Sequence, residues 1–73
     1  MEEKTASQAV YEEILNLFNT LKKPVSLWQI YQACKKKGFS LWKVRHSIKW
    51  LFDHYYLKWE GNEIVPIRDI GNE

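Results

Sequence analysis

A break of three residues, Gly38-Phe39-Ser40, separates two stretches in which apolar residues recur at helical spacing. Glycine favours the end of a helix because it adopts positive φ angles without steric strain, and a serine hydroxyl can cap the first turn of the next helix. Phe39, between these two signals, is expected to fold into the core. The sequence therefore predicts two helices joined by a tight turn.

Serine and glutamine mark the start of the first of these two helices. Ser26 and Gln29 stand three residues apart, the spacing of a capping box, and the run Lys35-Lys36-Lys37 precedes Gly38 at the other end. Ser40 is the predicted cap of the second helix. The predicted inward-facing residues are Leu27, Ile30, Tyr31 and Cys34 in the first helix, and Leu41, Val44, Ile48, Leu51, Phe52 and Tyr55 in the second.

A further helix is predicted upstream, from about Ser7 to Leu21. Thr5 and Gln8 repeat the capping-box spacing at its start. Pro24 has no amide hydrogen and moves its predecessor out of helical geometry, so the segment around it is predicted to be a turn. The inward face predicted for this helix consists of Val10, Tyr11, Ile14, Leu15, Phe18 and Leu21.

Two β-prone runs follow the helices, and the dipeptide Gly61-Asn62 lies between them. A two-residue connection with glycine at a position of positive φ is typical of a β-hairpin, so strands are predicted over residues 57–60 and 63–67. Trp59 is expected to pair across the hairpin with Ile64. Pro66 has no amide to donate, which predicts that the second strand is an edge strand.

The length of 73 residues is sufficient for one domain. We expect this domain to span residues 7–67, between a flexible N-terminus over residues 1–6 and a polar tail over residues 68–73. Cys34 is the single cysteine, which excludes an intramolecular disulfide and favours a reducing, cytoplasmic location. The acidic start of the chain is unlike a secretory signal, and its apolar runs are too short to cross a membrane.

Charge is distributed along the chain in blocks. Residues 22–58 carry nine basic side chains against Asp53 alone, a net charge of +8, whereas residues 1–21 and 59–73 each carry −3. A concentrated basic segment is typical of proteins that bind a polyanion such as a nucleic acid. A basic surface that serves solubility alone is the alternative.

Several of these positions occur in an order that a known family shares: Ser26, Gly38-Phe39-Ser40, Val44, Ile48, Leu51, Leu57 and Gly61. Together with the predicted elements, they resemble the winged helix-turn-helix family over residues 10–67. The resemblance implies an α+β fold of three helices followed by a short β-hairpin wing, with the third helix reading DNA. The sequence departs from the family pattern at Lys37, at His54-Tyr55-Tyr56 and at the wing tip, where Glu60 and Glu63 would repel a phosphate.

The outward face of the third predicted helix is basic and aromatic. Arg45 can donate two hydrogen bonds to O6 and N7 of a guanine, and His46 can exchange a hydrogen bond with a base edge. Ser40 marks the positive end of the helix dipole, where a phosphate can dock, and lysines suit phosphates as mobile charges. A solvated helix face is the alternative. The predicted DNA-binding residues are Ser40, Trp42, Lys43, Arg45, His46, Lys49 and Lys58.

The four tryptophans are too many to bury in so small a core, so at least one or two are expected at the surface. Exposed indoles favour an interface with a second copy of the chain or with another protein. The sequence therefore predicts a small transcriptional regulator that binds double-stranded DNA, as a homodimer. The alternative is a winged-helix module that docks on a larger replication or transcription assembly through its tryptophans and reads no bases.

Catalysis has little support in the sequence. His46 and His54 are eight residues apart, about two helical turns, which is too far along the axis to chelate one metal ion. The chain has no glycine-rich phosphate loop after a strand and no metalloprotease spacing. We therefore expect neither enzymatic activity nor a cofactor.

Overall fold

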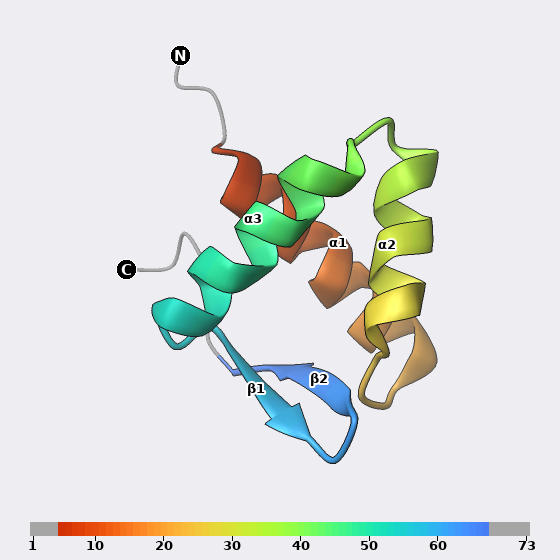
Figure 1. Cartoon of the computed structure of the whole chain (residues 1–73). Helices are drawn as coiled ribbons and strands as arrows, with labels where there is room; N and C mark the ends of the chain where they lie inside the picture. Colours follow the sequence, from red (N-terminus) through yellow and green to blue (C-terminus); the bar gives the residue numbers. More distant parts are fainter. Residues whose placement is uncertain (1–4, 68–73) are drawn as a thin grey trace.

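Residues 5–67 are described by the computed structural model, in which three helices are followed by a two-stranded antiparallel hairpin (Figure 1). This α+β layout was predicted from the sequence and is consistent with a winged helix arrangement. The predicted tail and residues 1–4 of the predicted flexible N-terminus lie outside the described residues. The elements are α1 (Ala6–Leu21), α2 (Leu27–Lys36), α3 (Leu41–Asp53), β1 (Leu57–Glu60) and β2 (Glu63–Pro66).

The helices begin at the predicted caps. The Thr5 hydroxyl accepts a hydrogen bond from the Gln8 amide at 3.1 Å, and the Gln8 side chain accepts one from the Thr5 amide at 3.4 Å. Ser26 and Gln29 form the same reciprocal box before α2, at 3.1 and 2.9 Å, and α3 begins after Ser40. These bonds satisfy amides that the first turn of a helix leaves without partners.

The turn after α2 is built on glycine, as predicted. The Gly38 amide donates to the Lys35 carbonyl and the Phe39 amide to the Cys34 carbonyl, both at 3.0 Å. These two bonds define a Schellman motif, which requires a residue of positive φ at the glycine position. Gly38 has a φ of +90°. The turn reverses the chain within three residues and lets α3 start at once.

The end of α3 has the same hydrogen-bonded turn, but a tyrosine occupies the glycine position. The Tyr55 amide donates to the Phe52 carbonyl at 3.1 Å, and the Tyr56 amide donates to the Leu51 carbonyl at 2.9 Å. Tyr55 has a φ of 63°, which costs a residue with a Cβ atom about 1 kcal/mol. The prediction that Tyr55 faces the core is wrong, because this turn directs its side chain into solvent, where it is 75% exposed.

The hairpin has the predicted register, with Trp59 opposite Ile64 and a φ of +66° at Gly61. The prediction that β2 is an edge strand is wrong at Ile64, because Val25 bridges this residue with backbone hydrogen bonds of 3.0 and 2.7 Å. The segment predicted to be only a turn therefore adds a short third partner to the hairpin. Pro66 lies two residues after Ile64, so the backbone groups of both residues face the same outer edge of β2. Pro66 has no amide hydrogen to donate at this edge.

The core lies where α1, α2 and α3 meet, and the hairpin closes one end of it (Figure 1). Tyr11 is fully buried, and its hydroxyl donates to the Tyr56 carbonyl at 3.2 Å. The two tyrosine rings pack edge to face, with their centroids 5.4 Å apart. These contacts hold α1 against the segment that precedes the hairpin. The buried apolar residues are Val10, Tyr11, Ile14, Val25, Ile30, Cys34, Val44, Ile48, Leu51, Leu57 and Ile64.

The predicted apolar faces are confirmed in the middle of each helix and are wrong at some helix ends. Leu21 is 37% exposed at the end of α1, and Leu41 is 61% exposed at the start of α3. A side chain at a helix end is covered only if a neighbouring element extends that far. Ser47, a polar residue of α3, is also buried. A small side chain at that position allows close packing between α3 and its neighbours.

Candidate nucleic-acid interface

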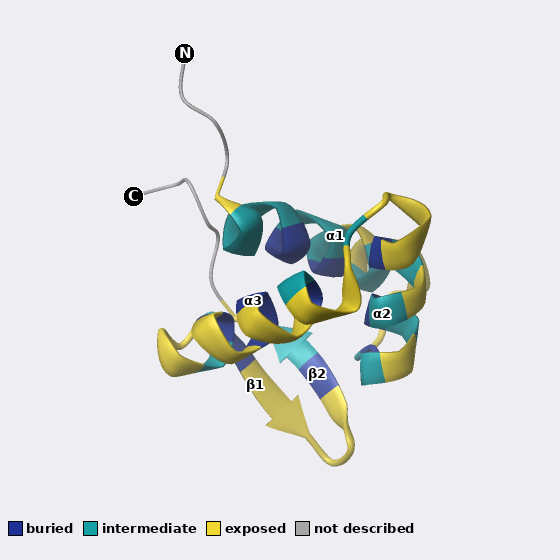
Figure 2. Ribbon diagram, turned by 45° about the horizontal axis from the view of Figure 1, so that its top comes forward, coloured by how far each residue is buried: buried dark blue, intermediate teal, exposed yellow. Residues whose placement is uncertain are grey.

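One long side of α3 is open to solvent (Figure 2). Trp42 is 70% exposed, and Arg45, His46 and Lys49 are also exposed. These four side chains line one shallow hollow in the surface. The structure therefore brings together the four residues that helical spacing placed on the outward face, while Val44 on the opposite side of the helix is buried.

Trp42 and His46 form a tilted aromatic pair at the N-terminal end of this hollow. Their ring centroids are 4.1 Å apart and their planes are tilted by 41°. The two residues are one helical turn apart, where side chains meet on the helix surface. Arg45 lies beside the pair and forms no ion pair within residues 5–67. Its planar set of N–H donors is therefore available to a ligand.

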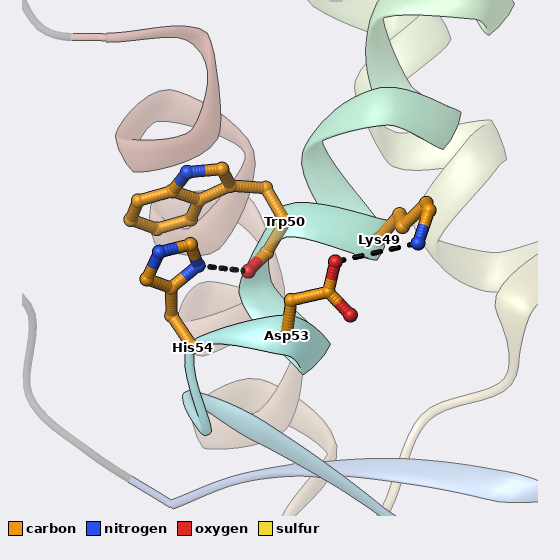
Figure 3. A network of polar contacts seen from close by, with 4 residues as sticks. All are labelled: Lys49, Trp50, Asp53 and His54. Carbon is orange, nitrogen blue, oxygen red and sulfur yellow. Dashed lines mark hydrogen bonds and ion pairs between the residues drawn. The ribbon is translucent and has the colours of Figure 1, made fainter.

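Lys49 differs from Arg45 because it already has an acidic partner. Its Nζ lies 3.3 Å from Oδ2 of Asp53, one turn further along α3 (Figure 3). Both side chains are more than half exposed, and an ion pair of this kind contributes at most about 1 kcal/mol. A phosphate can therefore replace the carboxylate at little cost. The position of Asp53 beside Lys49 was not predicted from the sequence.

Trp50 and His54 repeat the indole–imidazole pairing near the end of α3. Their rings are stacked at 3.9 Å with an angle of 20°, and Nδ1 of His54 lies 2.9 Å from the Trp50 carbonyl oxygen (Figure 3). Trp50 also stacks on Tyr56 at 5.8 Å. In Figure 3 this pair points away from Lys49 and Asp53, so it forms a separate aromatic surface on the other flank of the helix.

Ser40 and Lys43 lie at the start of α3, outside the hollow. The Ser40 hydroxyl accepts a hydrogen bond from the Lys43 amide at 3.1 Å and remains exposed. The Lys43 ammonium lies 4.9 Å from the centre of the Phe39 ring, an arrangement typical of a cation–π contact. Lys43 therefore leans over the turn before α3 and does not line the hollow.

Lys58 is exposed in the middle of β1, opposite Val65. The structure does not bring it into the hollow of α3. Glu60 and Glu63 face each other across the last pair of the hairpin, which makes the tip of the wing acidic. The wing therefore combines one basic side chain with two acidic ones.

A second hollow, which no pattern in the sequence indicated, lies at the turn between α2 and α3. It has a volume of about 450 Å³, and its lining is mainly apolar. Leu41 belongs to it, and helical periodicity had assigned that residue to the core. The sequence does not distinguish a leucine that is buried on the inward face from one that lies on the same face but beyond the edge of the core. The hollow is lined by Tyr31, Gln32, Lys35, Phe39, Ser40, Leu41 and Val44.

The tryptophans are more exposed than the sequence analysis required. Trp28 on α2 is 68% exposed, Trp59 on β1 is 52% exposed and Trp50 is 40% exposed, in addition to Trp42. Trp59 stacks on the Phe52 ring at 5.1 Å with an angle of 15°. The exposed indoles are spread over three elements, α2, α3 and β1.

Cys34 is fully buried in the core, as predicted. Burial, with a smaller contribution from the charge of Glu13, raises the pKa of its thiol to about 11. A thiol with so high a pKa is a poor nucleophile at neutral pH. Within the part of the chain that the structure describes, no three His, Cys, Asp or Glu side chains are placed to hold a metal ion. No helix among residues 5–67 has the length and apolar character needed to cross a membrane.

The chain matches no protein-family model, and no curated protein or solved structure is significantly similar to it. The resemblance to winged helix-turn-helix proteins therefore rests on the order of the elements.

Proposed function

We propose that this chain is a non-enzymatic winged-helix protein that binds double-stranded DNA through the outward face of α3 and regulates transcription. One observation carries the proposal: Trp42, Arg45, His46 and Lys49 share one solvent-exposed hollow on a helix that lies within a segment of net charge +8. An α-helix fits into the major groove of DNA, where each base pair presents a distinct pattern of donors and acceptors. The charge of the segment complements the phosphates on both sides of that groove.

The side chains of the hollow have separate roles in this proposal. Arg45 donates two hydrogen bonds to a guanine, and the neighbouring Trp42–His46 pair offers an apolar edge to a thymine methyl group. Lys43 and Lys49 contact phosphates on either side of the helix, which positions the domain without reading sequence. Ser40 contributes the start of the α3 dipole. Lys58 adds a further phosphate contact if the wing approaches the DNA.

A homodimer is part of the proposal. One domain of this size makes few phosphate contacts, and a second domain raises the effective affinity when both reach their half-sites. The two-fold symmetry of such a dimer matches a palindromic site.

The test is a fluorescence anisotropy titration of the chain with a random duplex and with a duplex selected for tight binding, each at several salt concentrations. The logarithm of the binding constant should fall with the logarithm of the salt concentration with a slope of about −0.9 for each phosphate contact. Two or three lysine contacts give a slope of about −2 to −3 for each domain. Absence of binding to both duplexes at low salt would sink the proposal.

The second candidate is docking to another protein, and exposed Trp28 favours it. This indole lies on α2 beside a groove formed with α1, whose lining includes Leu17 and Ala33. A protein interface built on aromatic side chains depends little on salt. Replacing Trp28 with alanine should leave DNA binding unchanged under the first proposal. Docking to a protein becomes the better explanation if the chain binds no DNA.

A further inference from the structure

The outer edge of β1 has no strand partner among residues 5–67. Its inner edge pairs with β2, and β2 is bridged on its other side by Val25. Glu60 and Glu63 close a two-residue turn, so they form a hydrogen-bonded pair, and such pairs alternate along an antiparallel hairpin. The backbone groups of Lys58 therefore face β2. Those of Leu57 and Trp59 face outward, where they can pair with another strand.

This alternation permits few registers for pairing with a second copy of the chain. Outward-facing residues must lie opposite each other, so Leu57 or Trp59 of one copy has to meet Leu57 or Trp59 of the other. Trp59 opposite Trp59 places Lys58 opposite Glu60 of the second copy, twice by symmetry. Leu57 opposite Trp59 would place Lys58 opposite Lys58, and Leu57 opposite Leu57 would move the pairing beyond the end of β1. Opposite charges stabilise a cross-strand pair and like charges destabilise it, which favours the register centred on Trp59.

The side chains of β1 suit this register. Lys58 and Glu60 are both exposed, lie on the same face of the strand, and form no ion pair within the described residues. In its own hairpin Glu60 faces the like charge of Glu63. Trp59 lies on the other face, stacked on Phe52 yet still 52% exposed. Pairing would give each Glu60 a cationic neighbour and set the two exposed indoles side by side.

We propose that two copies of the chain associate through the outer edges of β1, antiparallel, with Trp59 opposite Trp59 and Lys58 opposite Glu60. The result is a four-stranded sheet with the order β2, β1, β1, β2. This dimer rests on the homodimer in the proposed function, but its formation requires no DNA. In this dimer Lys58 pairs with Glu60, so the phosphate contact proposed above for Lys58 gives way to those of the lysines of α3.

The first experiment tests the proposed contact between Lys58 and Glu60 by chemical crosslinking. A carbodiimide joins a lysine amine to a carboxylate in contact with it, forming an amide and taking up the water that is lost. Equal amounts of the chain labelled with ¹⁴N and with ¹⁵N are mixed without DNA, treated and analysed by mass spectrometry of the peptides. The Lys58–Glu60 crosslink should join light to heavy chains. The ion pair between Lys37 and Glu13, at 3.7 Å within one chain, is the internal control and should give only unmixed crosslinks.

The second experiment measures self-association by sedimentation equilibrium up to millimolar protein. Lys58→Glu and Glu60→Lys should each weaken association about tenfold or more, because each sets like charges opposite each other twice. The double variant Lys58→Glu/Glu60→Lys restores opposite charges and should recover both association and the mixed crosslink between positions 58 and 60. Glu63→Lys is the matched control, since it makes the same change of charge on the same hairpin but lies on β2. It should leave association unchanged or strengthen it.

The outcomes separate this dimer from DNA binding. A chain that binds duplex DNA but gives no mixed Lys58–Glu60 crosslink overturns the β1 dimer and leaves the DNA proposal standing. A chain that gives the mixed crosslink and binds no DNA supports the dimer and contradicts the DNA proposal. Failure of the double variant to recover association overturns the proposed register.

Discussion

Arg45 is the residue at which the proposed DNA recognition can be separated from folding. Its side chain is exposed and forms no ion pair within residues 5–67, so Arg45→Ala should change the free energy of unfolding by no more than about 0.5 kcal/mol. Loss of a bidentate guanine contact should weaken binding to the selected duplex by about 1 to 3 kcal/mol and relax the preference at one base position. Anisotropy titrations with single-base variants of the duplex measure both effects.

Arg45→Lys is the control for this prediction. Lysine keeps the charge but lacks the planar fork of donors, so this variant should keep the salt dependence and still lose the preference for guanine. An equal loss of affinity on selected and random duplexes for Arg45→Ala would show that Arg45 contacts only a phosphate.

Cys34 makes the stability of the fold depend on pH in the alkaline range. Burial raises the pKa of the thiol from 9.0 to about 11, so the folded chain holds this proton more tightly than the unfolded chain does. The resulting stabilisation is complete below pH 9 and is lost as the pH rises from 9 to 11. We expect the unfolding free energy of the wild type to fall toward that of Cys34→Ala over this range.

The comparison between wild type and Cys34→Ala removes the contribution of other groups that titrate at high pH, because both proteins share them. Urea denaturation of both proteins at pH 8, 9, 10 and 11 gives the difference between their free energies of unfolding. A difference that stays constant over this range would contradict the assignment of the raised pKa to the folded state.

At the scale of elements, the ends of α2 and α3 offer a matched pair of substitutions. Both helices end in a Schellman motif, with Gly38 at the positive-φ position of the first and Tyr55 at that of the second. Tyr55→Gly should stabilise the chain by about 1 kcal/mol, because glycine adopts this conformation without strain. Thermal or urea unfolding measures the gain.

Gly38→Ala is the opposite change in the same motif. A Cβ atom at Gly38 would meet nothing within 4 Å, so its cost is that of the backbone conformation, about 1 kcal/mol of stability. If Tyr55→Gly instead destabilises the chain, the packing of the tyrosine outweighs the strain, and the side chain belongs to the structure rather than to a free surface.

At the scale of the whole molecule, Leu51 tests the placement of the core. It is fully buried on α3, the helix that packs most closely on α1. Leu51→Ala should cost about 2 to 5 kcal/mol, which is a large part of the roughly 4 to 11 kcal/mol expected for a domain of this length. Urea denaturation followed by circular dichroism should show an early transition or a population unfolded without denaturant.

Leu41→Ala is the same chemical change on the same helix, and both leucines were assigned to one inward face from the sequence. Leu41 is 61% exposed, so its truncation should cost less than about 1 kcal/mol. Equal losses for the two variants would mean that Leu41 is covered in the folded protein and that the hollow beside it is closed.

Features that depend only on neighbouring residues could be predicted from the sequence. The reciprocal boxes at Thr5 and Ser26 start their helices because the partners lie three residues away in the chain, whatever packs around them. Gly38 and Gly61 set their turns through their own φ angles. The exposed face of α3 around Arg45 was predictable for the same reason, since helical spacing fixes which side chains share a direction.

Features that depend on how far other elements extend could not be predicted from the sequence, because they arise from the folded structure. Leu41 and Ile48 are seven residues apart on α3 and point in nearly the same direction, yet Leu41 is 61% exposed and Ile48 is 7% exposed, because only Ile48 lies within reach of the neighbouring elements. The bridge from Val25 to Ile64 joins residues 39 positions apart, which no local pattern reveals. Spacing along a helix gives the direction of a side chain, whereas its burial and its partner depend on segments distant in sequence.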